Sequence, residues 1–158
     1  TLEGKQMGSA FKGGFDRFGA HILFDPVSLQ PATVTVDVDI NSIDTGAPDR
    51  DEMLRTKDWF DAAQFPMAHF ESKSFRKTGA GTYEVTGPLT MKGKTVQIVL
   101  PFKLDTSGRD SGRRTLAIVD GTITLDRSVF SLGTGDWAKT DVIANEVPVF
   151  IHITALLN

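Results

Sequence analysis

The feature that most constrains the fold is the strict alternation of apolar and polar side chains over residues 33–40, "TVTVDVDI". Val34, Val36, Val38 and Ile40 share one parity, while threonines and aspartates occupy the other. Because successive side chains of a β-strand point to opposite faces, this pattern predicts a strand with one dry and one wet face. Such two-sided strands are typical of antiparallel sheets.

The same alternation recurs along the chain and predicts about eight strands. It is found in "FDRFGAHILFD", "KTVQIVLPFKL", "TLAIVDGTITLD" and "EVPVFIHITALL". The connections "DPVSLQP" and "TSGRDSGRR" carry turn residues and are too short for repeated crossover helices. We therefore predict a single all-β domain over residues 1–158, either an antiparallel barrel or a sandwich.

One stretch interrupts the strands, "DRDEMLRTKDWFDAAQF" at residues 49–65. Asp49 and Glu52 have the spacing of a reciprocal capping pair, which predicts that a helix begins here with Asp49 as its N-cap. Trp59 and Phe60 fall on one apolar arc of this segment, which would pack against the sheet. We expect two short helical turns with a break between them.

Composition excludes several classes of protein. The net charge is -3, with 17 Lys and Arg against 20 Asp and Glu, and no basic run exceeds Arg113-Arg114, so nucleic acid is not an expected partner. Without cysteine there is neither a disulfide nor a thiol nucleophile. No apolar run approaches the roughly 18 residues of a transmembrane segment. The start, "TLEGKQMGSAFKGG", lacks the apolar core of a signal peptide, so we expect a soluble chain without its export signal.

Metal and catalytic motifs are weak. His21, His69 and His152 could in principle form an open zinc site. Each lies one residue out of phase with the apolar positions of its strand, so we expect all three to face outward and predict no metal site. No "GxSxG" elbow is present, and "DRDEM" lacks the ligand spacing and glycine of a Ca²⁺ loop. We predict no catalytic residue.

A closed barrel of about eight strands has an interior that is either filled by side chains or able to hold one small ligand, and the pattern alone leaves both open. The inward parity is apolar, so an admitted ligand would be apolar, such as a long isoprenoid or acyl tail. The predicted ligand-lining residues are Phe18, Ile22, Phe24, Val36, Val38, Phe70, Leu89, Met91, Ile98, Leu100, Phe102, Ile123, Leu125, Val149 and Ile151.

The order of sequence blocks resembles that of the YceI-like family. The blocks are "GGFDRFGAHILFDP", "VTVDVDINSIDTGAPDRDEMLRTKDWFDAAQFPMAHFESKSF", "YEVTGPLTMKGKTVQIVLPFKL" and "DRSVFSLGTGDW". The resemblance covers the chain from about Gly13 to the C-terminus. Its most specific part runs from "SIDTG" through "DWFDAAQFP" and "HFESKSF" to "GPLTMKG".

This resemblance implies an extended lipocalin-like antiparallel β-barrel that holds a polyisoprenoid or isoprenoid quinone, without a metal or any cofactor beyond that ligand. It also implies a periplasmic or secreted protein that is not an enzyme. The family's first strand is usually longer and more apolar than "TLEGKQMGSAFKGG", where Glu3 and Gly4 stand, so we expect the first strand to be incomplete.

By the same resemblance, the helical segment is expected to be a lid beside the barrel mouth. Trp59, Phe60 and Trp137 are then predicted ligand contacts, and Arg50 and Asp51 are predicted polar residues at the mouth. A homodimer would bury the outward-facing Phe150. Two alternatives stay open: an enzyme acting on the bound lipid, and a periplasmic interaction module serving a membrane redox protein.

Overall fold

The structure is a computed structural model that describes residues 1–25, 28–29 and 31–156. Its strands are β1 (Leu2–Gln6), β2 (Ser9–Phe15), β3 (Phe18–Leu23), β4 (Thr33–Asp39), β5 (Ile43–Asp44), β6 (Met67–Glu71), β7 (Ser74–Gly79), β8 (Thr82–Met91), β9 (Lys94–Asp105), β10 (Leu116–Asp126) and β11 (Glu146–Leu156). The helices are α1 (Pro48–Arg55) and the 3₁₀ helices η1 (Ile40–Ser42), η2 (Arg127–Phe130) and η3 (Gly135–Ala138).

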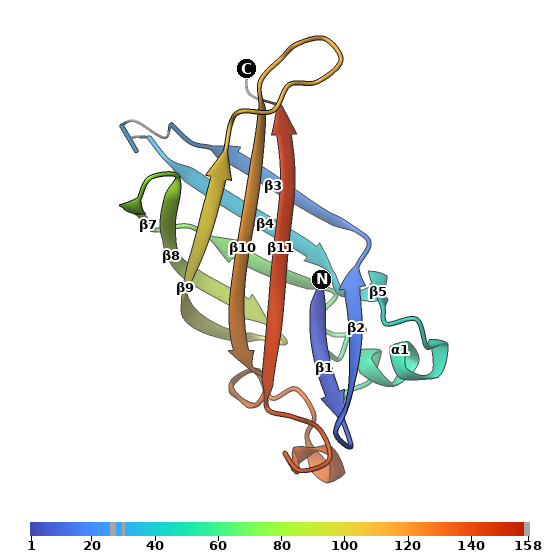
Figure 1. The fold of residues 1–158 in the computed structure, drawn as a ribbon. Coiled ribbons are helices and arrows are strands. Elements are labelled where there is room, and N and C mark those ends of the chain that lie inside the picture. Colours follow the sequence, from blue (N-terminus) through green and yellow to red (C-terminus); the bar gives the residue numbers. More distant parts are fainter. Residues whose placement is uncertain (26–27, 30, 157–158) are drawn as a thin grey trace.

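All strand pairs are antiparallel, and the strands form one sheet in the order β3-β4-β6-β8-β9-β10-β11-β1-β2-β5, with β7 beside β8. The sheet curls so that β3 and β4 cross behind β9, β10 and β11 (Figure 1). Its path ends at β3 and β5 within the described chain, which gives a curled half-barrel. The predicted all-β antiparallel class with one short helical segment is confirmed.

The register shows which alternating residues share a face. Tyr83 of β8, Phe102 of β9, Gly121 of β10 and Ile151 of β11 are direct cross-strand neighbours and form one row. Along β9 every second residue from Val96 onward is partly buried, and the residues between are exposed. The apolar parity predicted from the sequence therefore lies on the concave face of the curled sheet.

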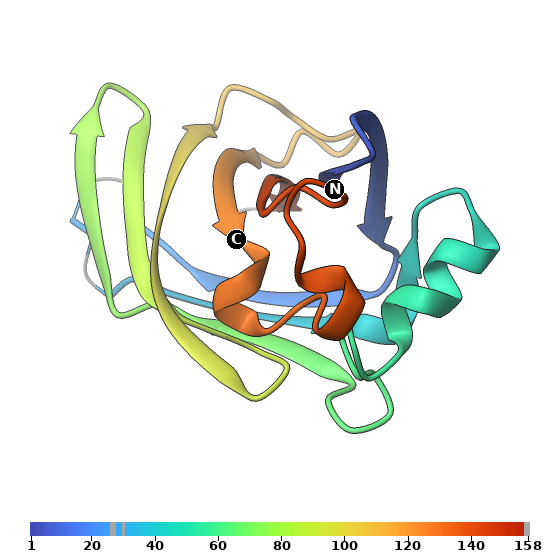
Figure 2. The same ribbon diagram turned by 90° about the horizontal axis from the view of Figure 1, so that it is seen from below.

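The helical segment differs from its prediction. Helix α1 begins at Pro48, which suits the first helical position because its fixed φ is already helical, and its N-cap is Ala47 rather than Asp49. Residues 56–65 form turns instead of a second helix. Helix α1 lies beside β5 at one side of the sheet (Figure 2). No helix of the described chain is both long and apolar enough to cross a membrane.

The main cluster of buried side chains sits at one end of the half-barrel, which we call the closed end. Figure 2 shows η2 and η3 lying across this lower end of the curled sheet. Turns that lie far apart in the sequence meet there and exclude water from one cluster. The cluster consists of Ile40, Ile43, Leu54, Trp59, Phe60, Ala62, Ala68, Phe130, Leu132 and Ile143.

Candidate functional site

The concave face of β9, β10 and β11 carries apolar side chains that the chain itself leaves only half-buried. This holds for the predicted lining residues Ile98, Leu100, Phe102, Ile123, Leu125, Val149 and Ile151. A core filled by its own side chains would cover such residues nearly completely. The concave face is therefore an apolar surface that the rest of the chain covers only in part. We take it as the candidate binding site.

The other predicted lining residues divide between this surface and the closed end. Val36 of β4, Phe70 of β6 and Leu89 of β8 are cross-strand neighbours and lie in one row. Phe70 is buried, with 8% of its surface exposed, whereas Val36 is half-buried. Val38, Leu89 and Met91 pack against the cluster at the closed end. The concave face thus passes without a break into the closed end along β4, β6 and β8.

Strand β3 carries its predicted lining residues at the edge of the sheet. Phe18 pairs with Val38 and Ile22 pairs with Val34, which places both on the concave parity. Phe18 is nonetheless 56% exposed and Ile22 39% exposed. In the described chain β3 has a neighbour on one side only, so its apolar side chains border an open margin of the site.

Phe24, directly after β3, belongs to an aromatic cluster with Phe75 of β7, Tyr83 of β8 and Phe102 of β9. The ring centroid of Phe24 lies 5.3 Å from that of Phe75 and 5.3 Å from that of Tyr83. Tyr83 and Phe102 stack at 5.5 Å. Phe24 and Phe102 thus both point inward, as predicted, and their rings pack against each other between the two layers of the half-barrel.

One charged residue on the concave parity was missed in the sequence. Lys77 pairs with Tyr83 and so shares its face, and its ammonium lies 6.0 Å from the centroid of the Tyr83 ring. Lys77 is exposed, at the end of β7. The strand pattern of "SFRKTG" is short and polar, and only its pairing register places Lys77 on this side.

Trp59 and Phe60 were expected at a barrel mouth, but the structure places both inside the closed end, 5% and 7% exposed. Trp137 is partly buried and its ring centroid lies 6.0 Å from that of Trp59. Phe60 packs edge-to-face on Phe15 at 5.8 Å. The expectation of a lid at the mouth is therefore wrong in location, because these rings supply the core that the end of the half-barrel needs.

Arg127 is the polar centre of the closed end, and nothing in the sequence distinguishes it from a surface arginine. It is 4% exposed, and its guanidinium carbon lies 5.5 Å from the centroid of the Trp59 ring. Burial lowers its pKa. The guanidinium donates hydrogen bonds of 2.8–3.2 Å to the backbone carbonyls of Ala144, Leu132, Gly133, Trp137 and Ile143. It thereby joins η2, η3 and the segment before β11.

Arg50 and Asp51 were predicted as polar contacts at the mouth, yet they connect α1 to β5. The Asp51 carboxylate is buried and accepts hydrogen bonds from Thr45 N at 2.8 Å and Thr45 Oγ1 at 2.6 Å. Arg50 Nε donates to Thr45 Oγ1 at 3.0 Å, and its guanidinium lies 4.1 Å from the Phe11 ring centroid. These contacts direct both side chains toward β5 and the Phe11 ring of β2 rather than toward a barrel mouth.

The three histidines lie outward, as predicted. His69 Nδ1 lies 2.7 Å from Asp37 Oδ1, and His152 Nδ1 lies 2.6 Å from Asp120 Oδ1, each across neighbouring strands. His21 is exposed on β3. Among the described residues, no group of three or more His, Asp or Glu side chains is placed to hold a metal ion.

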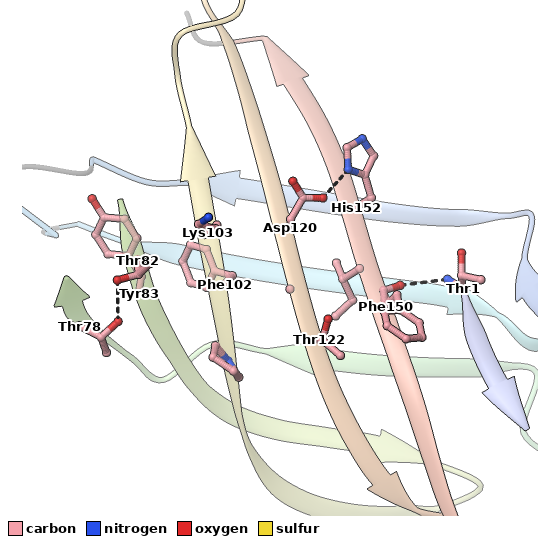
Figure 3. A pocket seen from close by; sticks show the side chains of 13 residues that line it. Thr1, Thr78, Thr82, Tyr83, Phe102, Lys103, Asp120, Thr122, Phe150 and His152 are labelled. Atoms are coloured by element: carbon pink, nitrogen blue, oxygen red, sulfur yellow. Dashed lines mark hydrogen bonds and ion pairs between the residues drawn. The ribbon is translucent and has the colours of Figure 1, made fainter. Parts of the chain in front are cut away.

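A hollow of about 510 Å³ lies over β8 to β11. Figure 3 shows its side chains, which include Lys103 on β9, Asp120 on β10, and Phe150 and His152 on β11. These side chains have the outward parity, and Asp120 already pairs with His152. The hollow is open, and its lining includes the charged side chains of Lys103 and Asp120, which do not suit an apolar chain, so we assign the candidate site to the concave face.

The chain matches the model of the YceI-like domain over residues 1–155. A Vibrio cholerae protein of family UPF0312 is 32% identical over 124 residues, which cover 78% of this chain but only 66% of that protein. Burkholderia cenocepacia BcnA has a structure with a TM-score of 0.90 and 33% identity, covering 98% of this chain and 93% of BcnA. A polyisoprenoid-binding domain from Saccharophagus degradans has a TM-score of 0.73 and 17% identity, covering 97% and 90%, which shows a shared fold.

Proposed function

Because this chain belongs to the YceI-like family, we propose that its concave face binds the apolar tail of a long-chain amphiphile, either a polyisoprenoid or an isoprenoid quinone. The observation that carries the proposal is the set of half-buried apolar side chains on β9, β10 and β11. A neighbour of the same fold is named as a polyisoprenoid-binding domain. The ligand would supply the cover that these side chains lack.

Hydrophobic burial is large enough to hold such a tail. Each buried methylene contributes about 0.8 kcal/mol, so two or three isoprene units offset most of the entropy cost of binding. A tail needs no hydrogen bonds, which fits inward residues such as Leu100, Ile123 and Val149. The head group would lie outside this surface, where polar side chains and water are available.

The same proposal makes the protein a carrier or store rather than an enzyme. The inward side chains of β9, β10 and β11 are all apolar and contain no group that could act as a general acid, base or nucleophile.

We further propose that the protein works in the periplasm and transfers its ligand to a membrane redox partner. Helix α1 contributes none of the large exposed apolar residues, so nothing favours that helix as a docking module.

The decisive experiment is organic extraction of the purified protein followed by mass spectrometry. We expect an isoprenoid lipid or quinone in the extract, and rebinding of a polyprenol or quinone to the stripped protein. The control is the variant Ile123→Asp, which places a charge on the concave face of β10 and should abolish rebinding. An empty extract together with no rebinding would refute the proposal.

We also propose that two copies associate through the outward face of β9 to β11, where Phe150 is 39% exposed. The Phe150→Lys variant should be monomeric by light scattering, whereas the unaltered protein should be a dimer. Since Phe150 points away from the concave face, ligand binding by this variant should not change. An unaltered protein that is monomeric at all concentrations would refute the dimer and leave the binding site unaffected.

A further inference from the structure

The two layers of the half-barrel separate along the upper part of β8. Strand β6 pairs with β8 only at His69 with Thr90 and at Phe70 with Leu89. The connection continues just beyond these two pairs, since Ser72 N donates to Val34 O of β4 and Lys73 N donates to Thr86 O of β8, and β8 then pairs with β7. Among the described residues no backbone hydrogen bond joins β3 to β7, β8 or β9, so side chains must close the space between β3 and these strands.

Phe24 makes that closure. Its ring comes from the end of β3 in the back layer and contacts rings on β7, β8 and β9, with centroid distances of 5.3, 5.3 and 6.0 Å. Tyr83, one of its partners, is only 4% exposed, whereas Lys77 on the same parity is exposed. The aromatic cluster thus stands between the concave face and solvent at this end of the half-barrel.

The opposite end is closed by the buried cluster around Phe130 and Leu132. Between the closed end and the aromatic cluster lie the half-buried residues of the proposed site, including Ile98, Leu100 and Ile123. An apolar chain lying on this surface would meet a wall at each end. One wall is part of the folding core, and the other is the aromatic cluster, in which the ring of Phe24 reaches from the end of β3 to rings on β7, β8 and β9.

We propose that Phe24 is a specificity-determining residue that limits the length of the apolar chain the protein accepts. This inference rests on the proposed lipid-binding function. A chain longer than the distance between the two walls would have to displace the Phe24 ring from its three aromatic partners. The site would therefore select uncharged chains by their number of isoprene units, independently of the head group.

The test is a competition among neutral polyprenols of graded length, offered as an equimolar mixture to the stripped protein. Bound polyprenols are extracted and counted by mass spectrometry. The Phe24→Ala variant removes a phenyl ring, about the size of one isoprene unit, and should shift the most abundant bound chain to one about a unit longer. Phe24→Trp should shift it to a shorter chain.

Phe24→Leu gives a milder change that keeps an apolar side chain in the cluster, and it replaces the alanine variant if that variant does not fold by circular dichroism. Phe150→Ala, on the outward face, is the matched control and should leave the length distribution unchanged. Identical chain-length distributions for the unaltered protein, the leucine variant and the tryptophan variant would overturn the inference about Phe24 but not the proposed function. Failure of the unaltered protein to bind any polyprenol would overturn the proposed function as well.

Discussion

The closed end and the concave face are built from the same residue types but differ in cover. At the closed end Phe130 is 1% exposed and Ile40 and Ile43 are each 2% exposed. On the concave face Leu100 and Ile123 keep apolar surface open. The first region has turns from two distant parts of the chain packed over it. The second has none, so its apolar surface is available to a ligand.

This difference teaches how one chain divides its apolar residues between folding and binding. A fully buried side chain contributes its transfer free energy and its packing contacts to the stability of the fold. A half-buried side chain contributes less of its transfer free energy to folding. The transfer free energy of its exposed apolar surface is gained only when a ligand covers that surface. We therefore expect substitutions at the closed end to affect stability, and substitutions on the concave face to affect binding more than stability.

The largest effect is expected for Arg127→Ala. This change leaves five backbone carbonyls of the closed end without their donor, and each buried unsatisfied acceptor costs about 1–3 kcal/mol. We expect a loss of roughly 4 kcal/mol or more in the free energy of unfolding, measured by urea titration. Arg109→Ala removes an exposed arginine that also bonds to carbonyls and should cost less than about 0.5 kcal/mol.

The next effect is expected for Phe130→Ala, which creates a cavity in the best-packed part of the closed end. Large-to-small changes of this type cost about 3–5 kcal/mol because the surroundings relax only partly. Thermal unfolding of the stripped protein should show a markedly lower Tm. A loss below about 1 kcal/mol would mean that the closed end is loosely packed and would remove the contrast with the concave face.

Removal of the ligand should have an intermediate effect. A ligand that binds only the folded state stabilises it by about 2.7 kcal/mol when present at a hundred times its Kd. The stripped protein should therefore unfold at a lower temperature than the protein as purified, and added polyprenol should restore the Tm. Equal Tm values with and without bound lipid would show that the concave face gains no cover from it.

The smallest effect on stability is expected for Leu100→Ala on the concave face. Leu100 is only half-buried, so its truncation should cost less than about 1 kcal/mol of unfolding free energy in the stripped protein. The same variant should weaken polyprenol binding by more than this, with a tenfold increase in Kd or about 1.4 kcal/mol, measured by fluorescence or calorimetry. A stability loss equal to that of Phe130→Ala would show that the two regions do not differ.

Much of the fold could be predicted because strand periodicity is local. The alternation in β9 set its faces correctly, and the outward position of His21, His69 and His152 followed from the same parity. In β4 the burial does not alternate, and the direction of Val36 and Val38 is shown by the pairing of Val36 with Phe70 and by the packing of Val38 on the closed end. The helix was less predictable. Pro48 at the first helical position outweighed the acidic capping pair, and the chain after Arg55 follows turns that bring Trp59 into the closed end.

The apolar character of the candidate site was predictable from the sequence, but the residues that border it were not. The apolar parity named Ile98, Ile123 and Val149 in advance, and the structure places them on one concave face. Arg127 could not be recognised, because its five acceptors are backbone carbonyls that have no signature in the sequence. Lys77 was missed because only the register of β7 with β8 gives its side.

The sequence by itself determined the strands, their two faces and the apolar character of the inward one, because side-chain direction along a strand depends only on parity. The tertiary structure alone decided which part of that apolar face is covered. Burial depends on what packs from elsewhere in the chain, and here residues 40–62 and 127–143 converge on one end only. This packing at one end separates the folding core from the proposed lipid site.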